Sequence, residues 1–223
     1  MIKGVIFDYN RTLYFDMDIA EYAYRKVYEK AGCDEKYFDD YYQTICRSGN
    51  TVSIKLLSEF AGRDFTEEEA KGYSDMIDEM YQQGCIWLHR DKLADGAEDL
   101  FAYLQEKGYR MTICTATVGS GVDFYFKNTK LDRWFDRKLV SHDDGVCVNK
   151  KEMYKKAAEN IGLKPEECLI FEDSIKGIED AMSVGFDKFI YVNHYHFPSS
   201  GYRQILQEIE NYQDLDYSIF EKN

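Results

Sequence analysis

Residues 5–13 read VIFDYNRTL, and this stretch decides the fold. A short apolar run ends at Asp8, and Thr12 follows four residues later. Open α/β sheets present side chains to a crevice in this way, on a buried strand that ends at the sheet's carboxyl edge. Asn10 occupies the position where a second carboxylate would act as proton donor. The stretch therefore predicts an aspartate that is either a nucleophile or a structural residue capping the turn, with an amide nearby instead of a second acid.

Length and charge narrow the class of protein. The chain has 223 residues, of which 44% are hydrophobic, so it can form one large domain or a core with an insertion. A net charge of −13 argues against nucleic-acid and anionic-membrane partners. No apolar run approaches the roughly 20 residues of a membrane-spanning helix, and the N-terminal residues enter a strand directly, which predicts no signal peptide.

The six cysteines show no Cys-x-x-Cys spacing, so a zinc site is not expected. Two of them, Cys114 and Cys168, lie inside apolar runs, where a thiol usually acts as a small hydrophobic group. This usage predicts a reducing cytoplasm.

Strand-like and helical patterns alternate along most of the chain. The apolar runs typical of strands are residues 3–8, 110–115, 138–141, 168–172 and 188–192. The helical patterns are residues 96–107, 152–161 and 174–184, each followed by a glycine that is typical of a helix end. This alternation predicts an α/β fold with a parallel sheet covered by helices on both faces. The acidic segment 207–223 predicts an amphipathic end helix and a loose terminus.

Residues 16–88 interrupt this rhythm. They contain no convincing strand and four helical segments, the last of which starts at a capping box formed by Thr66 and Glu69. We therefore predict an α/β core domain of residues 1–15 and 89–223, and a helical domain of residues 16–88 inserted after the first strand.

Polar residues follow several of the predicted strands. Besides Asp8, Thr115 ends the second run, where its hydroxyl and the amide of Ala116 can hold phosphate oxygens, although a threonine there also suits a turn or a helix cap. Lys150 opens a predicted helix, where it can neutralise a phosphoryl group, although a solvated surface lysine is the alternative. Lys151 competes for the same role.

An acidic pair follows the fourth run. Glu172 and Asp173 offer the hard oxygen ligands that Mg²⁺ prefers, although acids are also favourable at a helix N-terminus for electrostatic reasons alone. The conjunction of nucleophile, hydroxyl, lysine and acidic pair, each at a strand end and in this order, favours phosphate chemistry with magnesium.

With these four motifs and the helical insertion, the chain resembles the haloacid dehalogenase-like (HAD) hydrolase superfamily. Residues 8–12 match its Asp-x-Asp-x-Thr motif except at Asn10, and Arg11 stands where glycine is usual. Thr115 and Lys150 match the second and third motifs, and residues 172–174 resemble the fourth motif of β-phosphoglucomutase-like members. The resemblance implies a HAD-like Rossmannoid sheet with a C1-type helical-bundle cap.

The resemblance also implies roles for these residues. Asp8 would be the nucleophile and a metal ligand, and the backbone carbonyl of Asn10 would also bind Mg²⁺. Asp173 would bind the metal directly, and Glu172 directly or through water. The substrate would be a small phosphorylated metabolite, handled by a monomer or a homodimer.

Asn10 leaves three interpretations open, because an amide has no proton to give and is no base near neutral pH. The first is a Mg²⁺-dependent phosphohydrolase of weakened or altered specificity. The second is another HAD reaction, either dehalogenation or phosphonate cleavage. For phosphonate cleavage, Lys55 would be the candidate Schiff-base lysine. The third is a phosphate- and metal-binding protein that has lost turnover.

The loop of residues 47–51 between two cap helices would reach the active site by the same resemblance. Arg47 and Asn50 are therefore candidate substrate-selecting residues, with a solvated Arg47 at a helix C-terminus as the alternative. Arg11 is expected to contact the leaving group or an acidic cap residue. The identity of the substrate does not follow from the sequence.

Overall fold

The computed structural model describes residues 1–48, 52–198 and 201–221. The chain divides into two compact units. Met1–Phe15 and Lys92–Asn223 form one of them, which we call the sheet unit, and Asp16–Asp91 form the other, which we call the helical unit.

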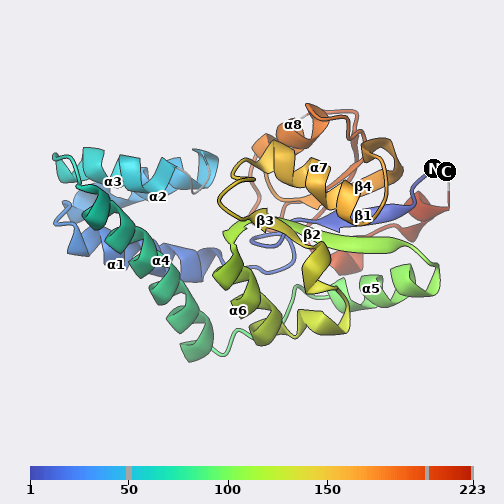
Figure 1. The fold of residues 1–223 in the computed structure, drawn as a ribbon, viewed down its shortest axis with the longest axis horizontal. Helices are drawn as coiled ribbons and strands as arrows, with labels where there is room; N and C mark the ends of the chain where they lie inside the picture. The colour runs from blue at the N-terminus through green and yellow to red at the C-terminus, as the bar shows by residue number, and fades with distance from the viewer. Residues whose placement is uncertain (49–51, 199–200, 222–223) are drawn as a thin grey trace. The chain divides into compact units, whose positions relative to one another are not determined.

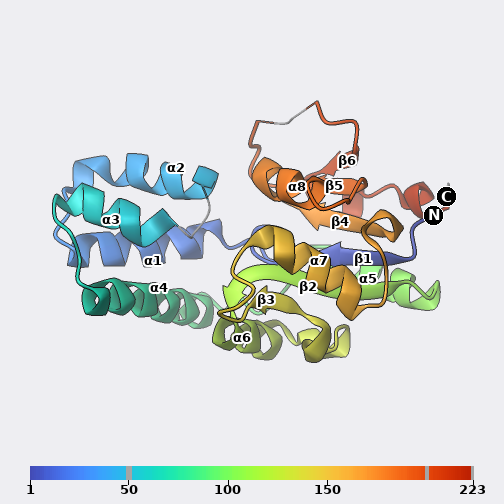
Figure 2. The same cartoon turned by 45° about the horizontal axis from the view of Figure 1, so that its top comes forward.

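The sheet unit contains a six-stranded sheet in which all neighbouring strands are parallel. Its strands are β1 (Gly4–Phe7), β2 (Arg110–Val118), β3 (Ser141–Asp143), β4 (Cys168–Glu172), β5 (Phe189–Val192) and β6 (Ile205–Ile209). They lie in the order β3-β2-β1-β4-β5-β6; β1 to β4 are labelled in Figure 1 and all of these strands in Figure 2. The chain builds outward from β1 first to one side and then, from β4, to the other. The carboxyl ends of β1 and β4 therefore form the topological switch point, where ligands bind in such sheets.

Helices cover both faces of the sheet (Figure 1). α7 (Lys150–Asn160) and α8 (Ile175–Met182) lie on one face, and α5 (Ala97–Glu106) and α6 (Gly119–Thr129) lie on the other. Successive side chains of β1 point to opposite faces of the sheet. Ile6 packs in the core with α7 and α8, whereas Phe7 contacts Phe101 of α5. Asp8 comes two residues after Ile6 and so emerges toward α7.

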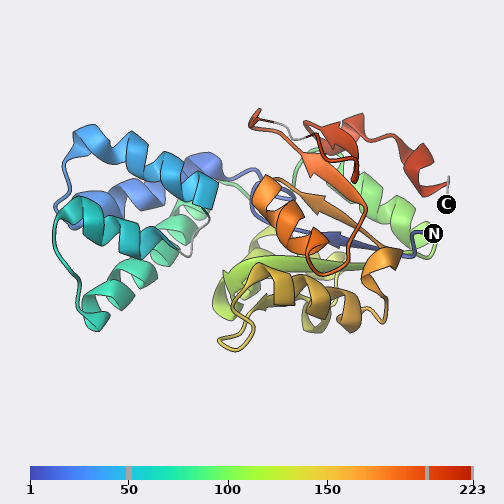
Figure 3. The ribbon, with the colours of Figure 1, turned by 90° about the horizontal axis from the view of Figure 1, so that it is seen from above.

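The helical unit consists mainly of α1 (Met17–Lys30), α2 (Phe38–Ser48), α3 (Ser53–Ala61) and α4 (Glu67–Trp87) (Figure 3). α4 begins at the predicted capping box of Thr66 and Glu69. The core of the helical unit is rich in tyrosine, and two of the hydroxyl groups donate to backbone carbonyls. Tyr42 donates to the carbonyl of Met17 at 2.8 Å, and Tyr28 donates to that of Asp34 at 3.2 Å.

The structure differs from the sequence predictions in three segments. Residues 138–140 are not part of a strand, because the Asp136 carboxylate accepts the Lys138 amide at 2.9 Å and starts a 3-10 helix; β3 begins only at Ser141. The α6 helix was not predicted, since its first residues include Gly119 and Gly121, which are poor helix formers. A side chain at position 121 would lie 2.4 Å from a methyl group of Thr117, which explains that glycine.

The predicted end helix is the third error. Ile205–Ile209 form the edge strand β6, in which burial alternates with period two, and two short 3-10 helices follow at Tyr212–Asp214 and Tyr217–Phe220. Pairing with β5 overrides the weak helical pattern of this acidic segment. Within the described residues, every helix is too short or too polar to span a bilayer.

Phe7 provides a test of the core. Its ring is fully buried and lies 5.2 Å from that of Phe101, 6.0 Å from that of Phe135 and 4.9 Å from that of Phe171. We expect Phe7→Ala to lower the free energy of unfolding by about 3–5 kcal/mol through the cavity that it leaves, measured by urea denaturation. The control Val146→Ala, at a side chain that is 91% exposed, should change it by less than about 0.5 kcal/mol.

Candidate active site

Asp8 lies at the carboxyl end of β1 and is nearly buried, with 6% of its surface exposed. Its amide continues the sheet pairing by donating to the carbonyl of Phe171 at 3.0 Å. One carboxylate oxygen, Oδ2, accepts the hydroxyl of Thr12 at 3.0 Å, and the other, Oδ1, accepts the ammonium group of Lys150. Burial raises the pKa of Asp8 to about 6, although Lys150 acts in the opposite direction.

Lys150 opens α7, whose N-terminus is capped by the side chain of Asn149. Its ammonium group also donates to the carbonyl of Cys114 at 3.3 Å and lies 3.8 Å from Glu172. Burial disfavours the charged lysine, but the carboxylates of Asp8 and Glu172 outweigh that effect and raise the pKa of Lys150. Lys151 points elsewhere: it is half exposed and lies 3.8 Å from Asp180.

Glu172 ends β4 and is already held by protein donors. One oxygen accepts the hydroxyl of Tyr154, and the other accepts the amide of Ser174 at 3.1 Å and its hydroxyl at 2.6 Å. Gly177 makes room for this carboxylate, because a Cβ at that position would lie 2.3 Å from the Glu172 carboxyl carbon. Tyr154 stands one helical turn after Lys150, so the helical period of α7 carries a signal that could have placed it at the site.

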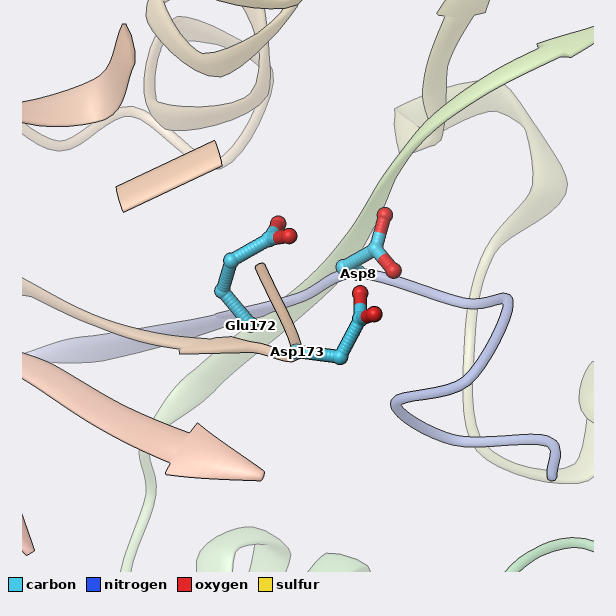
Figure 4. A group of neighbouring side chains, drawn as sticks. All are labelled: Asp8, Glu172 and Asp173. Atoms are coloured by element: carbon cyan, nitrogen blue, oxygen red, sulfur yellow. The ribbon is translucent and has the colours of Figure 1, made fainter. Parts of the chain in front are cut away.

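Asp173 completes a buried group of three carboxylates with Asp8 and Glu172 (Figure 4). Each residue offers one oxygen that lies within 4.8 Å of those of the other two. Arg11 forms an ion pair with Asp173, with 3.0 Å between Nε and Oδ2. Burial raises the pKa of Asp173 well above its usual value, an effect that Arg11 partly opposes.

This donor set fits a divalent cation. Three buried carboxylates so close together repel one another, and hard oxygen donors of this kind suit Mg²⁺. Asp8 and Asp173 can contribute oxygens directly. Glu172 is already engaged by Tyr154 and Ser174, so it fits a contact through water better than a direct one.

The predicted phosphate-binding residues lie on β2. Thr115 is buried within the strand, which continues to Val118, and does not end it. Its hydroxyl oxygen lies 3.1 Å from that of Thr117, and the Thr117 hydroxyl in turn donates to Oδ1 of Asn10 at 3.3 Å. Ala116 is exposed between them.

Asn10 is fixed by a hydroxyl group that was not predicted. The oxygen of the Tyr125 hydroxyl lies 3.1 Å from Nδ2 and 3.2 Å from Oδ1 of Asn10. The ring of Tyr125 also stacks on that of Tyr9, with centroids 4.0 Å apart. Tyr125 belongs to α6, so the sequence carried no signal that would bring it to this site.

Two sequence predictions fall outside what the structure describes. Asn50 lies outside the described residues, and Arg47 is part of α2 but its side chain is not described. Arg11 pairs with Asp173 within the site, which replaces the expectation that it meets an acidic residue of the inserted domain.

A family model described as "haloacid dehalogenase-like hydrolase" matches residues 2–185. The chain belongs to this family. The resemblance seen in the sequence is therefore confirmed, and so is the α/β fold expected from it. The family is one of hydrolases, and phosphatases are among the relatives that the chain matches.

Relatives and solved structures match most of the chain. A phosphorylated carbohydrates phosphatase of Thermotoga maritima is 24% identical over 204 residues, which are 86% of each protein. A HAD hydrolase of family IA, variant 3, from Entamoeba histolytica superposes with a TM-score of 0.83 at 22% identity, over 97% of this chain and 96% of that one. A β-phosphoglucomutase from Clostridium difficile gives 0.80 at 18% identity, over 100% and 96%. At these identities the structures show a shared fold.

The two adjacent lysines provide a matched pair for testing this geometry. Lys150→Gln removes the cation beside two buried carboxylates and is expected to lower the free energy of unfolding by on the order of 3 kcal/mol. Lys151→Gln, at a half-exposed side chain, should change it by less than about 1 kcal/mol. Urea denaturation in a chelating buffer measures both; equal effects of the two substitutions would contradict the assignment of Lys150 to the site.

Proposed function

We propose that the protein is a Mg²⁺-dependent phosphohydrolase that acts on small phosphorylated metabolites through an aspartyl-phosphate on Asp8. The observation that carries the proposal is the position of Asp8, which lies buried at the switch point between the ammonium group of Lys150 and the carboxylates of Glu172 and Asp173. Such a site places an anionic nucleophile, a fixed cation and a metal-binding set together, which is what phosphoryl transfer requires.

In the first step, a carboxylate oxygen of Asp8 attacks phosphorus, the bond between phosphorus and the leaving oxygen breaks, and the leaving group departs as an anion that takes a proton from solvent. In the second, water attacks the same phosphorus and loses a proton to solvent, the bond to Asp8 breaks, and phosphate and the free carboxylate are released. Asp8, Asp173 and the backbone carbonyl of Asn10 would hold Mg²⁺, which when bound would neutralise negative charge on the phosphoryl oxygens.

The remaining residues position the anion. Lys150 stays charged beside Asp8 and balances the negative charge of the phosphoryl group. We propose that the Thr115 hydroxyl and the amide of Ala116 hold phosphoryl oxygens. The helical unit would serve as the cap, with Arg47 and Asn50 as substrate-selecting residues. In the sequence it is inserted between the nucleophile loop and the segment that leads to β2.

Asn10 determines which substrates react well. Its amide has no proton to donate to a leaving alkoxide and cannot activate water. A leaving group that departs as a stable anion needs no such proton. We therefore infer that aryl and acyl phosphates are better substrates than alkyl phosphates.

A second candidate function is a phosphate-binding protein without turnover. The observation that favours it is the fixed amide of Asn10, held by hydroxyls of Tyr125 and Thr117 where an acid would act. Among other HAD reactions, dehalogenation needs no magnesium. The three carboxylates of Asp8, Glu172 and Asp173, which suit a metal ion, therefore favour phosphate chemistry over dehalogenation. A panel measuring release of phosphate, chloride and fluoride, with and without Mg²⁺, separates these functions.

Metal removal is the first test. EDTA should abolish the release of p-nitrophenol from p-nitrophenyl phosphate, and added Mg²⁺ should restore it. Without the metal, the carboxylates of Asp8, Glu172 and Asp173 would repel the phosphate dianion. Asp8→Asn is the blank and should stay inactive under both conditions. Hydrolysis that survives chelation would rule out a role for magnesium.

Substitution of Asn10 is the second test. Asn10→Asp restores a proton donor and should raise kcat/KM for alkyl phosphates by about 10²–10⁴-fold, with a smaller gain for p-nitrophenyl phosphate. Steady-state phosphate release measures both. Asn10→Ala, which removes the amide without adding an acid, should raise neither. If wild type and Asn10→Asp hydrolyse alkyl phosphates equally well, this interpretation of position 10 is wrong.

A further inference from the structure

Arg11 is held in an unusual backbone conformation within the nucleophile loop. Its φ is +62°, in the left-handed region that glycine adopts most easily. The loop fixes this conformation, because the Arg11 amide donates to the carbonyl of Tyr14 at 2.7 Å. A long cationic side chain is thus carried at a position whose backbone favours glycine.

The side chain reaches the metal-binding carboxylates. Nε of Arg11 lies 3.0 Å from Oδ2 of Asp173, and the two side chains are 24% and 5% exposed. Asp173 is one of the three residues whose oxygens lie within 4.8 Å of one another. The guanidinium group of Arg11 therefore binds one oxygen of Asp173, the carboxylate that we assign as a direct ligand of the metal.

Charge counting shows what this costs a metal ion. With all three carboxylates ionised, the group carries −3, and Lys150 and Arg11 bring the sum to −1. A divalent cation would make it +1, whereas without the arginine the sum would reach zero. In a buried site this difference is poorly screened.

We propose that Arg11 is a built-in counter-ion of Asp173 that competes with the divalent cation, so that the protein binds Mg²⁺ more weakly than its carboxylates alone would. This inference rests on the proposed function only in taking Asp8 and Asp173 as the metal ligands. An arginine that merely orients Asp173 for the metal would have the opposite effect, because its removal would weaken metal binding.

Calorimetric titration with MgCl₂, in phosphate-free buffer and without substrate, distinguishes these roles. Arg11→Gly removes the charge and suits the left-handed backbone, and Arg11→Asn removes the charge with a residue that also tolerates this conformation. Both should bind Mg²⁺ about tenfold more tightly than wild type, since the positive charge beside Asp173 no longer opposes the cation in this buried site.

Two controls accompany these variants. Arg133→Gln removes one positive charge from an exposed pair with Glu98 outside the site and should leave the affinity for Mg²⁺ within about twofold of wild type. Asp173→Asn should abolish binding both in wild type and in the Arg11→Gly background, which identifies the measured site.

The possible results separate the two proposals. Equal or weaker binding by both Arg11 variants, with Asp173→Asn still abolishing it, would overturn the competition and leave the metal site intact. A similar gain for Arg133→Gln would also overturn it, because net charge alone would then explain the effect. Binding that is unaffected by Asp173→Asn, or absent from every variant, would overturn the metal site itself and the inference with it.

Discussion

Three carboxylates buried within 4.8 Å of one another are the constraint on which the rest of the site depends. Like charges repel strongly where water is excluded, so the surrounding structure has to supply cations and donors. Lys150 reaches Asp8 from the start of α7, Arg11 reaches Asp173 from the nucleophile loop, and hydroxyl groups engage Glu172. Parallel pairing of β1 and β4 makes the crowding unavoidable, because both strands end at the same edge.

Positions 10 and 11 change the charge of this site in the same direction. An amide at position 10 avoids a further carboxylate, and an arginine at position 11 adds a cation where the resemblance to HAD enzymes leads one to expect glycine. The Asn10 amide is fixed by hydroxyl groups on β2 and α6, and the Arg11 guanidinium by Asp173. Both residues are therefore integrated into the hydrogen-bonded structure, which is why we treat them as determinants of substrate and metal affinity.

Much of the fold could be predicted because it follows from local patterns. The helices around the central strands, and the capping box at Thr66, depend on consecutive residues and on the spacing of apolar side chains. The α6 helix and the β6 strand could not be predicted in the same way. Position 121 requires glycine because a Cβ there would clash with Thr117, and β6 forms because its backbone pairs with that of β5. In both segments a tertiary contact overrides the local propensity.

The sequence by itself determined the order and type of the reactive groups, because a carboxylate, hydroxyl or lysine at a strand or helix end is visible in consecutive residues. Only the tertiary structure decided which groups meet. It brought Lys150 and not Lys151 to Asp8, and it joined Tyr125 to Asn10 across 115 positions of the chain. Such pairings depend on how helices dock on the sheet, and docking is set by side-chain packing over the whole core, which no local pattern encodes.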